Sequence, residues 1–181
     1  MNSHYALLAI TSLLLACGGP ATPDTPGLDD RDISQVEACE ELLFSLRNTS
    51  VSTRSHDTLD AILDEADALL PHCRAAYPRV ASSRAERHFN VHRAEQIALQ
   101  ALFLEAELAE ARLDHALYCD VLGHAFRLLF QGVSRLDEAL LEDELSPDER
   151  ARFRELRGLD LQAIDVLFLT YEGRCGDPSP P

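Results

Sequence analysis

Residues 83–111 read SRAERHFNVHRAEQIALQALFLEAELAEA, without a glycine or a proline. Ser83 and Glu86 have the spacing of a capping box, in which the serine oxygen accepts a backbone N–H of the first helical turn and the glutamate reaches back. Residues 98–111 are apolar on most sides, which is typical of a helix buried among other helices. We therefore expect a central helix that begins at Ser83 and breaks near residues 112–115, because an unbroken helix through the next apolar stripe would be about 90 Å long.

Two apolar stripes at helical spacing precede this central segment. The first predicts a helix over residues 33–47, and a polar loop over residues 48–56 separates it from the second. Pro71 lies inside the second stripe and is expected to kink or end that helix. The two stripes consist of Val36, Cys39, Leu43 and Leu46, and then of Leu59, Ile62, Ala66, Leu69 and Cys73.

Two further stripes follow the central segment. Between them, residues 146–149 (Ser-Pro-Asp-Glu) combine an N-cap, a proline at the first helical position and a capping glutamate, so a helix is expected to start there. No segment alternates as a strand would, and the sequence predicts an all-α bundle of about five helices over residues 33–176, with a tail at 177–181. The stripes consist of Leu122, Phe126, Leu129, Val133, Leu136 and Leu140, and then of Phe153, Leu156, Ile164, Leu167 and Tyr171.

A short apolar run lies at the N-terminus. Residues 6–16 read ALLAITSLLLA, eleven residues where a bilayer span needs about 20, which is typical of the apolar region of a signal peptide. The run ends in Leu-Leu-Ala-Cys at residues 14–17, which resembles the lipobox of bacterial lipoproteins. In that family the cysteine receives diacylglycerol, the chain is cut just before it, and the new amine is acylated. The resemblance implies a signal peptide over residues 1–16 and lipidation of Cys17, which would anchor the protein to a membrane.

Residues 17–32 are rich in proline, glycine, threonine and aspartate, a composition that predicts a flexible tether. In lipoproteins of Gram-negative bacteria, an aspartate directly after the lipidated cysteine tends to retain the protein at the inner membrane. Gly18 occupies that position here, so the resemblance implies the outer membrane, at its periplasmic face or at the cell surface.

Four cysteines remain after Cys17: Cys39, Cys73, Cys119 and Cys175. An even number outside the cytoplasm favours two disulfides, for which three pairings exist. Cys119 lies 27 residues before Ser146 and Cys175 lies 29 after it, so an antiparallel hairpin places them level with each other. We therefore expect Cys119–Cys175 and, between the first two helices, Cys39–Cys73. A structural zinc site is the alternative, but no C-x-x-C pair supports it.

The composition excludes several classes of function. The formal net charge is -15, which argues against binding to nucleic acid and permits a basic protein partner. All 16 basic residues are arginine, so Schiff-base lysines, pyridoxal chemistry and P-loop nucleotide binding are excluded. No catalytic motif is present, and we expect neither an enzyme nor a cofactor.

One cluster could carry metal chemistry. His88 and His92 are one helical turn apart, and Glu95 is three residues further along the same face, a set that can bind zinc, copper or nickel. The same spacing also arises by chance on an exposed helix. The leading hypothesis is therefore a membrane-tethered, non-enzymatic lipoprotein that acts as a protein-binding or structural module. The alternative is a periplasmic metal-binding or metal-sensing protein that uses these three residues.

Overall fold

The computed structural model describes residues 30–143 and 145–176, and the regular structure of these residues is entirely helical. This confirms the all-α bundle. The signal peptide, Cys17, most of the tether and the tail at 177–181 lie outside the described residues. The helices are α2 (Asp30–Arg47), α3 (His56–Ala76), α4 (Arg84–Ala111), α5 (His115–Leu140) and α6 (Pro147–Cys175).

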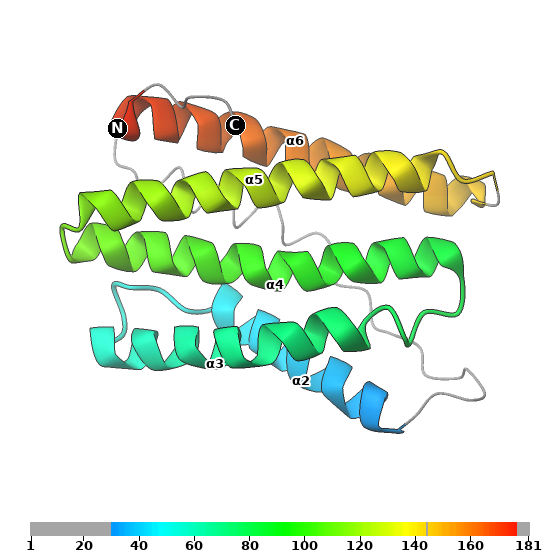
Figure 1. Ribbon diagram of the computed structural model, residues 1–181, viewed down its shortest axis with the longest axis horizontal. Coiled ribbons are helices and arrows are strands. Elements are labelled where there is room, and N and C mark those ends of the chain that lie inside the picture. The colour runs from blue at the N-terminus through cyan, green and yellow to red at the C-terminus, as the bar shows by residue number, and fades with distance from the viewer. Residues whose placement is uncertain (1–29, 144, 177–181) are drawn as a thin grey trace.

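The central helix α4 is shared by two groups of helices. Figure 1 shows α3, α4, α5 and α6 side by side in that order, with α2 crossing behind α3. Helix α4 packs against α2, α3 and α5, and α5 packs against α6. One apolar core lies among α2, α3 and α4 and a second among α4, α5 and α6. Side chains fully buried in these cores include Leu59 and Ile97 in the first and Leu122 and Leu167 in the second.

The two helix starts predicted from capping residues are confirmed, with one difference in detail. At Ser146 the capping box with Glu149 is complete. At Ser83 the serine oxygen accepts the N–H of Glu86, but the Glu86 carboxylate accepts the N–H of Ser82, one residue earlier than expected. Both arrangements satisfy backbone donors that a helix start leaves without partners.

The predicted break after the central helix is also confirmed, although no glycine marks it. Leu113 has φ of 59°, the left-handed conformation in which helices often end. The N–H of Asp114 donates to the carbonyl of Ala109, and the N–H of Leu113 donates to the carbonyl of Glu110. These two bonds form a Schellman motif, which reverses the chain between α4 and α5.

Two boundaries differ from those expected. Helix α2 begins at Asp30 rather than Ile33, and acidic side chains at Asp30 and Asp32 favour its positive N-terminal end. Pro71 does not end α3, which continues to Ala76. Burial stabilises the part of α3 that follows Pro71, because Ala76 and the disulfide-bonded Cys73 are both fully buried.

The expected disulfide pairing is confirmed. Cys39 is bonded to Cys73 with 5.8 Å between their Cα atoms, and Cys119 is bonded to Cys175 with 5.7 Å. The first bond joins α2 to α3 and the second joins α5 to α6, so each of the two helix groups is covalently fixed. None of the helices in the described part of the chain combines the length and apolar composition that a bilayer span requires.

Candidate functional site: a cleft between α3 and α5

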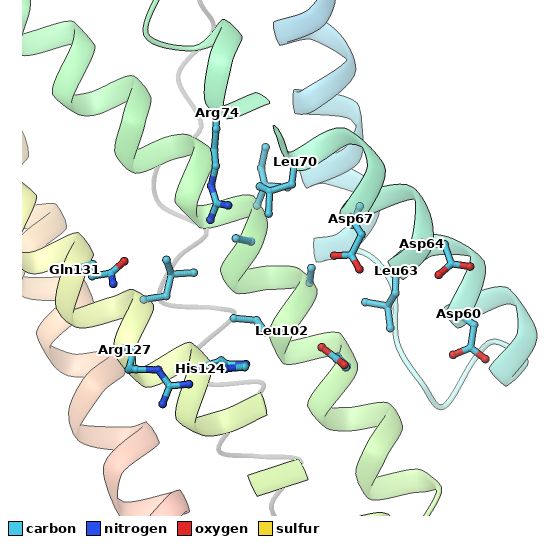
Figure 2. A pocket seen from close by; sticks show the side chains of 16 residues that line it. Asp60, Leu63, Asp64, Asp67, Leu70, Arg74, Leu102, His124, Arg127 and Gln131 are labelled. Atoms are coloured by element: carbon cyan, nitrogen blue, oxygen red, sulfur yellow. The ribbon is translucent and has the colours of Figure 1, made fainter. Parts of the chain in front are cut away.

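A cleft of about 510 Å³ lies over α4, between α3 and α5 (Figure 2). Its floor consists of small and apolar side chains of α4. The floor includes Ala98, Ala101 and Leu102. The two alanines carry only a methyl group, so α4 fills little of the space between α3 and α5. Helices α3 and α5 both pack on α4 and stand apart on either side of this floor.

Helix α3 supplies an acidic wall. Asp60, Asp64 and Asp67 recur at helical spacing and all line the cleft. Leu63 and Leu70 of the same helix also line it. Asp60 already accepts a hydrogen bond from Arg112, at 2.5 Å. By contrast, Asp64 and Asp67 are exposed and form no ion pair within the described residues.

Helix α5 supplies the opposite wall, which carries basic and amide side chains instead of carboxylates. His124, Arg127 and Gln131 are exposed and recur at helical spacing, and Figure 2 shows them on the side of the cleft facing the three aspartates. Arg127 has no ion-pair partner within residues 30–143 and 145–176. The two walls therefore present unpaired charges of opposite sign across an apolar floor.

At one end of the floor lies the carboxylate of Glu105, whose pKa is shifted from its ordinary value. Glu105 of α4 is half-buried, and its pKa is raised by burial and by the negative charge of Asp67. His124 on the opposite wall acts in the other direction. This end of the cleft thus concentrates negative charge that a cation from a bound partner would stabilise.

The structure does not bring the three expected metal ligands together. His88 contacts Glu142, with Nε2 and Oε1 3.1 Å apart. His92 is buried and faces Asp160 of α6. No group of three or more histidine, cysteine, aspartate or glutamate side chains among residues 30–143 and 145–176 is arranged to hold a metal ion. Metal binding by this set stays a prediction that the observed side-chain positions do not favour.

Glu95, the third expected ligand, is engaged by two cations. Arg74 donates to it from α3 at 2.9 Å and Arg135 donates from α5 at 2.8 Å. Burial alone would raise the pKa of Glu95, but the hydrogen bonds and positive charges of Arg135 and Arg74 together outweigh burial and lower it. Glu95 therefore crosslinks α3, α4 and α5, and Arg74 is held at one end of the cleft.

Comparison with known proteins found no relative: no family model, no curated protein and no solved structure matches the chain.

Proposed function

We propose that this protein is a membrane-tethered, non-enzymatic lipoprotein whose helical domain binds a segment of another protein in the cleft between α3 and α5. The observation that carries the proposal is an apolar floor between two walls on which Asp64, Asp67 and Arg127 form no ion pair within the described residues. Asp64, Asp67 and Arg127 are exposed at the rim and are free to meet a bound chain. An apolar groove edged by charge is a recurring way to bind an amphipathic helix.

The shape of the cleft favours a polypeptide over a small molecule. Along α3 its lining extends from Asp60 to Arg74, which at 1.5 Å per residue is about 21 Å. A helix of roughly 14 residues has this length. Small-molecule sites bury most of a ligand's surface among mainly apolar side chains, whereas the charged groups here stand on exposed rims.

The charges favour a basic partner. The acidic wall of α3 and the half-buried Glu105 attract arginine or lysine along one edge of the bound segment. The net charge of -15 acts at longer range and should speed the encounter with a basic protein. Arg127 on the opposite wall suits an acidic or amide side chain along the other edge of the segment.

Membrane attachment is the second part of the proposal. It rests on the lipobox resemblance at residues 14–17 and on the tether composition of residues 17–32. Several acyl chains on Cys17 would hold the protein stably at a membrane, by resemblance the outer membrane. A flexible linker lets the helical domain search the space around its anchor.

A synthetic helix tests the cleft directly. The probe is an alanine–leucine peptide of about 18 residues with arginine along one edge, long enough to span the α3 wall. We expect it to bind the wild-type domain, and Asp67→Arg to weaken binding roughly tenfold because attraction becomes repulsion. Titration calorimetry gives the affinity, and stopped-flow fluorescence should show association slowing as ionic strength rises from about 0.05 to 0.5 M.

Glu65→Arg is the matched control. Glu65 is exposed on the same helix but does not line the cleft, so this variant makes the same change of net charge elsewhere. Equal effects of the two substitutions would mean that only the overall charge matters, and the cleft proposal would be abandoned. Binding that is insensitive to both variants and to salt would contradict it as well.

A further inference from the structure

The centre of the bundle contains a polar contact that the cleft does not use. His92 of α4 and Asp160 of α6 have only 4% and 1% of their side chains exposed, and Nδ1 of His92 lies 3.7 Å from Oδ2 of Asp160. Gly132 of α5 leaves the space for it. A Cβ atom at residue 132 would lie 3.0 Å from Oδ2 of Asp160 and 3.7 Å from Nδ1 of His92. Three helices therefore meet at one carboxyl–imidazole contact.

No arginine compensates the charge of Asp160. Neither of its side-chain oxygens has a hydrogen-bond partner among residues 30–143 and 145–176. Arg157, three residues earlier on α6, donates instead to Asp137 of α5. Arg135, the cation of α5 near this contact, donates to Glu95. An ionised Asp160 would thus be a buried carboxylate without a partner of opposite charge, which is costly.

The groups around His92 leave it without a strong partner too. Gln96 lies one turn further on α4, and its Nε2 is 3.4 Å from Nε2 of His92. Arg47 of α2 and Arg93 of α4 line a cavity of about 20 Å³ beside the imidazole. Arg93 donates to Glu40 of α2 at 2.5 Å.

Burial acts on the two groups in opposite directions. It raises the pKa of Asp160 to about 7. It lowers the pKa of His92 to about 4, with Glu95 opposing and Arg135 adding to the decrease. Both effects favour the uncharged forms, because burial disfavours a charge of either sign. Between about pH 4 and pH 7 the contact therefore joins a protonated carboxyl group to a neutral imidazole.

We propose that His92 and Asp160 form a proton-binding site that holds α6 against α4 and α5, and that α6 loosens when this site loses its proton. In the protonated state we expect the two side chains to close from 3.7 Å to hydrogen-bond distance, with the O–H of Asp160 donating to Nδ1 of His92. Nε2–H of His92 can then donate to the Gln96 amide oxygen, which a half-turn of the amide presents. On deprotonation the O–H bond breaks, the proton passes to water and its electron pair stays on the buried carboxylate. This proposal does not depend on the function of the cleft.

The first test measures the pH at which Asp160 loses its proton in the protein without substitutions. Nuclear magnetic resonance of the chain labelled with ¹³C at aspartate carboxyl groups follows each titration. We expect the Asp160 signal to titrate with a midpoint near 7, about three pH units above that of an ordinary aspartate. A midpoint below 5 would overturn the proposal without any variant being needed.

The second test measures the loosening of α6 by amide hydrogen exchange, corrected for the intrinsic effect of pH. If Asp160 regains its ordinary proton affinity when α6 opens while His92 stays neutral on α4, exchange of α6 amides should rise up to about 100-fold between pH 5 and pH 8. Proton uptake by His92 on opening would reduce this rise, because it favours the open state at low pH. Asp160→Asn keeps the side-chain shape but cannot ionise, and should abolish this rise.

Asp165→Asn serves as the matched control, because Asp165 is exposed on the same helix. It should retain the wild-type rise in exchange. Protection of α6 that is equal at pH 5 and pH 8 in the wild type would contradict the proposal. A rise that persists in Asp160→Asn would do so too, since the proton would then belong to another group.

Discussion

Replacing both Cys119 and Cys175 with serine is expected to lower the free energy of unfolding by about 4 kcal/mol. The bond between them spans 56 residues of sequence, and closing a loop of this size restricts the unfolded chain by about that amount. Cys119 lies near the start of α5 and Cys175 is the last residue of α6, so the bond closes the hairpin at the end opposite its turn. Equilibrium unfolding in urea measures the change.

The loss of stability is easier to assign to the disulfide itself at Cys119 and Cys175 than at Cys39 and Cys73. Cys119 and Cys175 are half-buried, so serine at these positions is not forced into an apolar core. Cys39 and Cys73 are 1% and 0% exposed, and the corresponding double substitution should cost more than its loop of 34 residues alone accounts for. A loss below about 1 kcal/mol in the Cys119/Cys175 variant would show that the bond does not restrain the unfolded chain as described.

Lowering the pH from 6.5 to 4 is expected to destabilise the wild-type protein more than the His92→Gln variant, by up to about 3 kcal/mol. Burial keeps His92 neutral in the folded chain by lowering its pKa from 6.5 to about 4. The unfolded chain binds a proton at the ordinary pKa of histidine, so acid favours unfolding across this interval. Glutamine removes the titrating group, and with it this part of the acid sensitivity.

Urea unfolding at a series of pH values measures this difference. His72→Gln is the control, because His72 is exposed on α3 and its replacement should leave the pH dependence of the wild type intact. Asp160 contributes a slope of opposite sign in every one of these chains, since its raised pKa makes stability fall as pH rises from about 4 to 7. Parallel curves for wild type and His92→Gln would contradict the burial of a neutral imidazole.

Much of the fold could be predicted because its signals are local. The capping box at Ser146 marks the start of α6 from four consecutive residues, and the register of a hairpin about that turn pairs Cys119 with Cys175. Of the two expected effects of Pro71, a kink or an end, the end is wrong, because the helical propensity of one residue is a local preference that packing can override. The disulfide at Cys73 and the burial of the turn around it hold the helix beyond the proline.

The candidate site could not be predicted in the same way. The cleft combines stripes from three helices, and nothing in the sequence states that α3 and α5 stand apart over Ala98 and Ala101. The spacing of His88 and His92 placed them on one face of a helix, but their partners, Glu142 and Asp160, come from distant segments.

The burial of Asp160 could not be predicted from the sequence either. In the sequence it resembles the many carboxylates that solvated helix faces explain. Its burial depends on Gly132, 28 residues earlier, which leaves space for the carboxyl group between α4 and α6. Gly132 carries no turn and no break within α5, so its role becomes visible only when the helices are packed.

If a basic segment of another protein occupies the cleft, site-specific photo-crosslinking in the native cells should capture it. A photoreactive residue at Gln131, on the cleft wall, is compared with one at Ser134, exposed on the same helix but outside the lining. We predict an adduct from Gln131 alone, lost in Asp67→Arg and retained in Glu65→Arg, in which the crosslinked peptide is a basic amphipathic segment. An adduct of equal yield from Ser134, an acidic crosslinked peptide, or an adduct unaffected by Asp67→Arg would show that no basic segment occupies the cleft.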